Sequence, residues 1–72
     1  MNLKDPKVLT EEYLRIMQKF LDVGAPKELA SLQASITLSK EFSGKKKLEI
    51  FDIDYYSRII TAIVDGVLFL KN

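Results

Sequence analysis

Residues 43–46 hold the spacing that comes nearest to a catalytic motif. They read Ser43-Gly44-Lys45-Lys46, the Ser-x-x-Lys spacing of some acyl-transfer enzymes, in which the lysine activates the serine. A lysine takes that role only where desolvation removes its charge, whereas a turn with three successive lysines is expected to be hydrated. The chain contains no histidine and no cysteine, so Ser-His-Asp and Cys-His centres cannot form. We therefore expect no catalytic residues and a protein that is not an enzyme.

Acidic residues follow this turn and offer the oxygen ligands that Mg²⁺ and Ca²⁺ prefer. Glu49, Asp52 and Asp54 nevertheless lack the spacing of an EF-hand and the glycine at its turn. Gly44-Lys45 lacks the earlier glycine of a phosphate-binding loop. Because histidine and cysteine are absent, the commonest transition-metal ligands are missing as well. The sequence predicts no metal site and no cofactor.

Three successive lysines, Lys45, Lys46 and Lys47, form the basic cluster of the chain. They could contact the phosphates of a nucleic acid in a weak, salt-sensitive manner, or bind an acidic protein. Lysine runs at loop tips also serve as plain solubilising surface. No arginine accompanies the cluster, and the nearest aromatic residues, Phe42 and Phe51, are expected in the core rather than stacked on bases. The cluster supports an alternative function, that of a small regulatory protein with a nucleic-acid or acidic protein partner.

The size of the chain favours self-association. Its 72 residues allow a single small domain over residues 1–72, and so short a chain buries only about 60% of its unfolded surface. Small domains compensate with disulfides, a structural metal or oligomerisation, and the first two are not expected here. Hydrophobic residues make up 47% of the chain, and the net charge of +1 gives no general attraction to nucleic acid or anionic membranes. We expect a homo-oligomer.

No segment of the sequence is typical of export or of membrane insertion. The first twelve residues are charged and contain Pro6, unlike a cleavable signal peptide. The longest apolar stretch, from Ile59 to Leu70, is shorter than a membrane span and is interrupted by Asp65. We expect no membrane association and a cytoplasmic location.

The spacing of apolar residues predicts a first helix over residues 6–23. Asp5-Pro6 or Thr10 would supply its start, and Gly24 suits the position just past its end. The residues that recur at helical spacing are Leu9, Tyr13, Ile16, Met17, Phe20 and Leu21.

Residues 26–43 fit two structures. Pro26 suits the first turn of a helix, and apolar residues would then line one face. Residues 32–39, however, alternate between apolar and polar in the manner of a strand. Their hairpin partner would be residues 47–53, across the turn at 43–46. We favour the helix, and the alternative is an α+β fold with two helices on a β-hairpin of residues 32–39 and 47–53.

The last segment predicts a third helix over residues 54–71. Asp65-Gly66 is also typical of a hairpin turn, but residues 59–64 show no alternation. The polar residues Asp54, Arg58, Thr61 and Asp65 instead recur at helical spacing. Asp54 would be the N-cap and would pair with Arg58 one turn later. The predicted fold is all-α, a compact three-helix bundle that dimerises through this C-terminal helix.

This third helix carries more apolar surface than a peripheral helix in so small a domain can bury. One apolar stripe includes Tyr56 and Ile60, and a second consists of Tyr55, Ile59, Ala62, Gly66 and Phe69. Gly66 inside a helix costs about 1 kcal/mol relative to alanine and would let another helix approach closely. The function predicted first is a non-enzymatic, homodimeric interaction module. Its predicted interface consists of Tyr56, Ile59, Ile60, Ala62, Ile63, Gly66, Val67 and Leu70.

The stretch from Asp52 to Leu70 resembles the last helix of TetR-type transcriptional regulators. The likeness lies in an acidic start, a run of branched apolar residues, and Asp65-Gly66 followed by further apolar residues. In that family this helix packs in a four-helix dimer interface, so the resemblance implies a dimerising segment that is part of a regulator. The helix-turn-helix of the family would lie upstream, and nothing in this sequence matches it.

Overall fold

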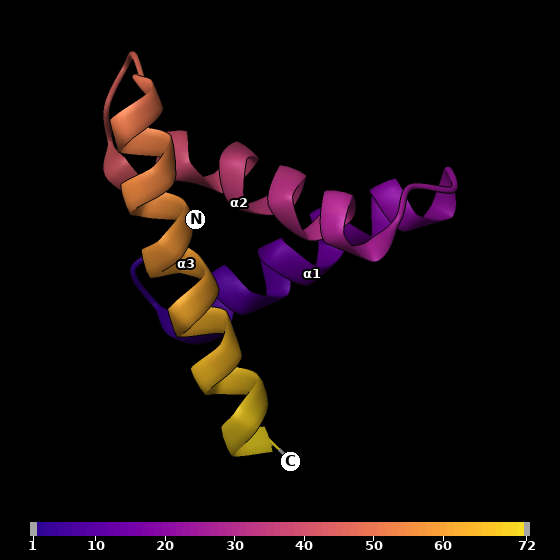
Figure 1. The fold of residues 1–72 in the computed structure, drawn as a ribbon. Coiled ribbons are helices and arrows are strands. Elements are labelled where there is room, and N and C mark those ends of the chain that lie inside the picture. The colour runs from indigo at the N-terminus through magenta and orange to yellow at the C-terminus, as the bar shows by residue number, and fades with distance from the viewer. Residues whose placement is uncertain (1, 72) are drawn as a thin grey trace.

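Three helices make up the fold (Figure 1). A computed structural model describes residues 2–71, with α1 at Pro6–Asp22, α2 at Lys27–Ser43 and α3 at Ile50–Lys71. The prediction of an all-α three-helix bundle is confirmed. The alternative β-hairpin is wrong, because no strand occurs within residues 2–71. Residues 32–39 lie inside α2, and residues 47–53 form a loop and the first turn of α3.

The ends of α1 follow the signals in the sequence. The Asp5 carboxylate accepts a hydrogen bond from the Lys7 backbone N–H at 2.9 Å, and Pro6 opens the helix. Thr10, the other predicted start, lies inside α1, where it is buried and donates its hydroxyl to the Pro6 carbonyl at 2.8 Å. Gly24 follows the C-cap with φ of 92°, a conformation that glycine adopts without strain.

Buried serines explain why part of α2 mimics a strand. Ser39 is completely buried and donates its hydroxyl to the Ser35 carbonyl at 2.7 Å. The Ser35 hydroxyl donates to the Ser31 carbonyl at 3.1 Å and shares a hydrogen bond with the Thr61 hydroxyl of α3 at 3.3 Å. Polar residues of the alternating pattern therefore lie in the interior, bonded to their own helix. The buried apolar residues of α2, one turn apart, are Ala30, Ala34, Leu38 and Phe42.

The start of α3 differs from the prediction by one turn. The helix begins at Ile50 rather than at residue 54. The Asp52 carboxylate accepts the Glu49 backbone N–H at 3.1 Å, so Asp52 rather than Asp54 satisfies a donor at this end. Asp54 instead lies within the helix and pairs with Arg58, with 3.2 Å between carboxylate and guanidinium, as predicted.

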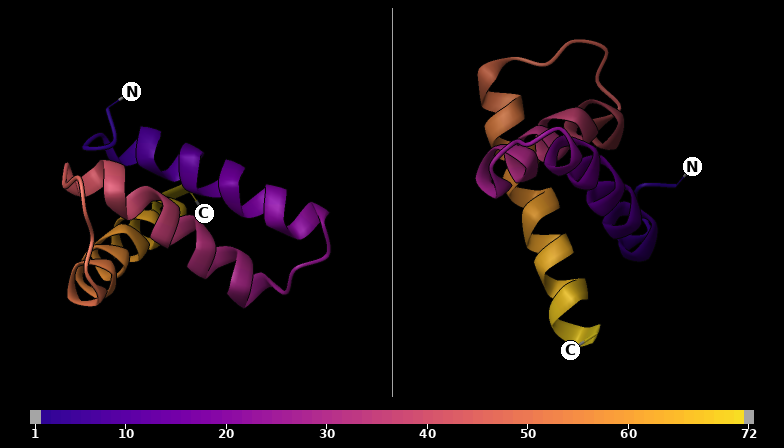
Figure 2. Two further views of the ribbon diagram at one scale, coloured as in Figure 1. Left: turned by 90° about the horizontal axis from the view of Figure 1, so that it is seen from above. Right: turned by 90° about the vertical axis from the view of Figure 1, so that its right-hand side faces the viewer.

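Each helix contacts the other two. α1 and α2 lie beside each other, and α3 crosses the ends of this pair that lie away from the loop of residues 23–26 (Figures 1 and 2). The molecule measures 31 × 28 × 20 Å. Across residues 2–71, every helix is too short or too polar to span a lipid bilayer. The buried apolar core consists of Leu3, Leu9, Tyr13, Ile16, Ala34, Leu38, Phe42, Ile60 and Val64.

Candidate interaction surface

α3 contributes to the core through one side alone. Of its described residues, Ile60 and Val64 are buried, with exposed fractions of 0% and 1%. They lie one turn apart, so they point to the same side of the helix. Tyr56, Ile59 and Ile63 pack against the core from the edges of this side and are partly buried. On the opposite side of α3, Tyr55 and Phe69 are exposed.

The eight residues of the predicted interface do not form one surface. Ile60 lies at the centre of the core and is not accessible to a partner. Four others are partly buried, namely Tyr56, Ile59, Ile63 and Val67. The three that are exposed are Ala62, Gly66 and Leu70. The predicted set merged two sides of the helix, because the sequence does not show which apolar stripe faces the core.

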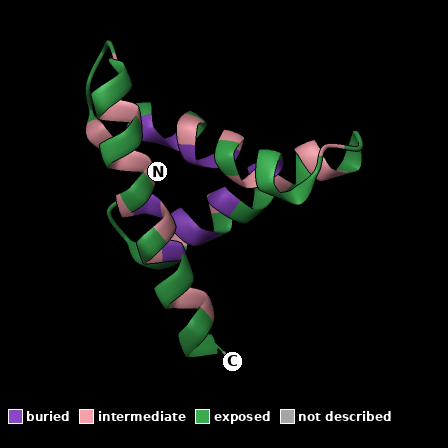
Figure 3. Ribbon diagram, in the orientation of Figure 1, coloured by how far each residue is buried: buried purple, intermediate pink, exposed green. Residues whose placement is uncertain are grey.

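The exposed side of α3 is an apolar strip that runs the length of the helix. Figure 3 shows exposed residues at both ends of α3. The exposed fractions are 85% for Phe51, 61% for Tyr55, 79% for Phe69 and 84% for Leu70. Apolar patches of this kind on small proteins mark interaction sites. We call this surface the outer face. Its exposed residues are Phe51, Tyr55, Ala62, Gly66, Phe69 and Leu70, and the partly buried Ile59 lies at its edge.

Three aromatic residues of the outer face were missing from the predicted interface. Tyr55 and Phe69 belong to the second apolar stripe of the sequence, so the signal for them was present. Phe51 was expected in the core, and this prediction is wrong. Its 85% exposure follows from the earlier start of α3, which places Phe51 one turn before Tyr55 on the same side.

Gly66 lies on the outer face, in the C-terminal half of α3. A Cβ atom placed on it would have no atom within 4 Å. A helical glycine costs about 1 kcal/mol relative to alanine, and the packing of this chain offers no compensation. The absence of a side chain at this position leaves room for the backbone or a large side chain of another molecule.

Two charged residues of opposite sign lie along one edge of the outer face. Arg58 and Asp65 both line the shallow groove between α2 and α3, together with Leu32. The Arg58 guanidinium contacts the Asp54 carboxylate of the preceding turn, and both side chains remain largely exposed. Surface pairs of this kind contribute little to stability, so Arg58 and Asp65 remain available for a partner that lies along this edge.

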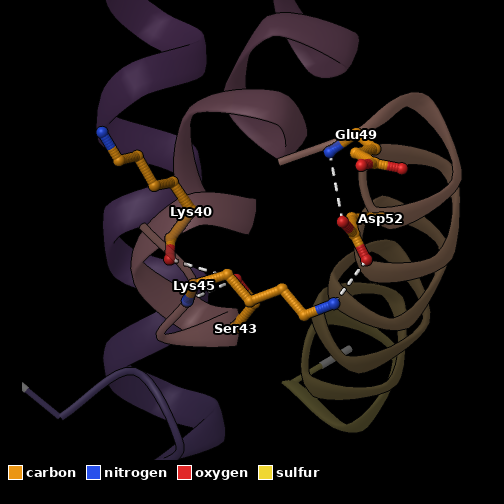
Figure 4. A network of polar contacts seen from close by, with 5 residues as sticks. All are labelled: Lys40, Ser43, Lys45, Glu49 and Asp52. Atoms are coloured by element: carbon orange, nitrogen blue, oxygen red, sulfur yellow. Dashed lines mark hydrogen bonds and ion pairs between the residues drawn. The ribbon is translucent and has the colours of Figure 1, made fainter. Parts of the chain in front are cut away.

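The basic loop is held by an ion pair (Figure 4). The Lys45 ammonium donates to the Asp52 carboxylate at 2.7 Å. This hydrogen bond is the main reason why the pKa of Asp52 is lowered and the pKa of Lys45 is raised. The Ser43 hydroxyl donates to the Lys40 carbonyl and accepts the Lys45 backbone N–H, each at 3.2 Å, so it serves the turn.

This arrangement bears on both roles considered for the loop. The pair with Asp52 already neutralises one of the three lysines, which leaves Lys46 and Lys47 as the exposed basic pair. A hydrated, charged lysine is the opposite of what serine activation requires. Among residues 2–71, no group of three or more acidic side chains lies close enough to hold a metal ion.

No protein-family model, curated protein or solved structure matches the chain. Its function is therefore inferred from its own surfaces. The outer face of α3 combines exposed aromatic residues, an unobstructed glycine and an edge with both charges. These features together suit the binding of another helix.

Proposed function

We propose that the protein is a non-enzymatic interaction module that forms a homodimer through the outer face of α3. The observation that carries the proposal is the division of α3 into two apolar sides. One side closes the core through Ile60 and Val64, while the other exposes large apolar side chains over the whole helix. Water contact with so much apolar surface is unfavourable, by roughly 25 cal/mol per Å², and a second copy removes it.

The residue types of the outer face support this role. Tyr and Phe are enriched at the centres of protein interfaces, where a few aromatic anchors supply most of the binding energy. Phe51, Tyr55 and Phe69 would be such anchors. The chain has neither cysteine nor histidine, so association is the remaining way for so small a domain to gain stability. The resemblance of residues 52–70 to the dimerising helix of TetR-type regulators supports the same assignment.

The proposal is tested by sedimentation velocity over a range of protein concentrations. Phe69→Lys is the informative variant, and Val23→Lys is its matched control. Both positions are exposed to about the same extent, 79% and 81%, and both lie at a helix C-terminus, where a lysine suits the helix dipole. We expect Phe69→Lys to weaken dimerisation by about tenfold or more, while Val23→Lys leaves it unchanged.

Circular dichroism shows whether both variants remain helical, so that loss of dimer is not confused with loss of fold. An unmodified chain that sediments as a monomer at every concentration would refute the proposal. The same conclusion follows if Phe69→Lys dimerises as tightly as Val23→Lys.

A further inference from the structure

The outer face has the spacing of helices that pair along their length. Tyr55, Ile59, Ala62, Gly66 and Phe69 follow one another at intervals of four, three, four and three residues. This alternation keeps one seam of a helix against a partner helix over several turns. Tyr55, Ala62, Gly66 and Phe69 lie on the exposed side of α3, and Ile59, at the edge of the seam, is partly buried and also packs against the core. A second helix can therefore lie along the seam without disturbing the bundle.

Large and small residues on this seam are arranged symmetrically about the centre of α3. The helix runs from Ile50 to Lys71, so its midpoint lies between Ile60 and Thr61. Ile59 and Ala62 are equally far from this midpoint, on opposite sides of it. A second α3 that runs antiparallel about a twofold axis at the midpoint therefore places Ile59 against Ala62 of the second copy.

The same symmetry matches the outer layers. Tyr55 and Gly66 are equidistant from the midpoint, so the Tyr55 ring would lie over Gly66 of the second copy. Gly66 has the free space that this needs, with nothing within 4 Å of its missing Cβ. Phe51 and Leu70, both more than four-fifths exposed, would meet at the two ends. Each inner layer then joins a large residue to a small one, as well-packed cores require.

A parallel arrangement of the two helices packs poorly. It would place Ala62 against Ala62 and Gly66 against Gly66, which makes two successive layers without large side chains. Ile59 and Phe69 would meet their own copies on either side of these layers and keep the helices apart. Cavities of that kind are unfavourable. The distribution of side-chain size therefore favours the antiparallel direction.

Charge favours the same direction. Arg58 and Asp65 lie on one edge of the seam, beside the groove between α2 and α3. In the antiparallel pair this edge faces the same edge of the second copy, so Arg58 approaches Asp65 of the second copy, and the contact occurs twice. A parallel pair would put the two Arg58 side chains on opposite sides of the interface, where neither reaches an Asp65.

We propose that the partner of the outer face is a second copy of this chain, with the two α3 helices antiparallel and centred on each other. Arg58 and Asp65 fix the register through two symmetric ion pairs. This inference rests on the proposed homodimer and specifies its geometry. It names residues that lie opposite each other, so it can fail even if the chain dimerises.

Cysteine cross-linking tests the geometry directly, because the natural chain has no cysteine. Tyr55→Cys and Gly66→Cys are prepared separately and oxidised alone and as a mixture. In the antiparallel pair the two residues 55 lie about 16 Å apart along the axis, beyond the roughly 7 Å between Cα atoms that a disulfide tolerates. Residue 55 of one copy lies opposite residue 66 of the other, so we expect a covalent dimer in the mixture alone.

The outcomes separate the two proposals. Covalent dimers from each variant by itself would show parallel helices, which overturns the antiparallel geometry while the homodimer stands. A dimer in sedimentation that never cross-links through these positions would place the contact elsewhere and also overturn the geometry. A chain that is monomeric throughout would overturn the homodimer itself.

Charge reversal tests the register. Arg58→Asp and Asp65→Arg each create two like-charged contacts per dimer, and we expect either change to raise the dimer Kd by about tenfold. The double variant Arg58→Asp/Asp65→Arg restores opposite charges and should return the Kd to within about threefold of the natural value. If the double variant dimerises as weakly as the single variants, Arg58 of one copy does not contact Asp65 of the other.

Discussion

α2 and α3 differ in how their composition relates to their burial. Six residues of α2 are buried, and two of these are serines. α3 is longer and more apolar, yet two of its 22 residues are buried. α2 lies beside α1 and also contacts α3, whereas α3 crosses the pair and touches it along one side. The position of a helix in the fold, rather than its composition, therefore decides how many of its residues are buried, and α3 keeps apolar side chains exposed.

The largest expected effect comes from the inner side of α3. Ile60→Ala leaves a cavity among residues of all three helices, and we expect a loss of about 2–5 kcal/mol in the free energy of unfolding. Leu70→Ala, at a position that is 84% exposed, should cost less than about 0.5 kcal/mol at concentrations where the chain is monomeric. Urea denaturation measures both. Equal losses in the free energy of unfolding would contradict the conclusion that one side of α3 is buried in the core and the other is exposed.

An intermediate effect is expected from a buried serine of α2. Ser39→Leu makes the helix more apolar, but residue 39 has no exposed surface, so a larger side chain must displace the residues packed around it. We expect a loss of about 1–3 kcal/mol in the free energy of unfolding from overpacking. The control is Thr37→Leu, an exposed position of the same helix, which should be nearly neutral. Thermal unfolding of both variants provides the measurement, and a stabilised Ser39→Leu would contradict the prediction.

The smallest effect concerns glycine. Gly66→Ala removes an unfavourable helical glycine and meets no neighbouring atom, so the free energy of unfolding of the monomer should rise by about 0.5–1 kcal/mol. Gly44→Ala provides the contrast, because Gly44 ends α2 with φ of 73°, where alanine is strained. It should lower the same quantity by about 1 kcal/mol. If both variants lower the free energy of unfolding in dilute solution, Gly66 has a structural role within the monomer.

Much of the fold follows from local signals in the sequence. The first helix has a capping aspartate, a proline at its first position and a glycine after its end, and all three act as expected. α2 was harder to predict, because a buried serine bonded to its own helix looks like the polar half of a strand pattern. Only the packing of α2 against two neighbours distinguishes these cases.

The start of α3 and the limits of its outer face depend on contacts that the sequence does not show. Asp52 and Asp54 are equally suitable near a helix start, and the contact of Asp52 with Lys45 and the Glu49 N–H decides between them. The apolar stripes of α3 were visible as patterns. Which stripe enters the core depends on the angle at which α3 crosses α1 and α2, and long-range packing sets that angle.

A helix that seals the interior with one side and offers the other to a partner makes folding and assembly thermodynamically linked. A molecule that binds the exposed side of such a helix also stabilises the buried core on its other side, because it binds only the native state. For the proposed homodimer, the melting temperature would therefore rise with protein concentration. Dilution of the proposed homodimer would lower its stability without any other change.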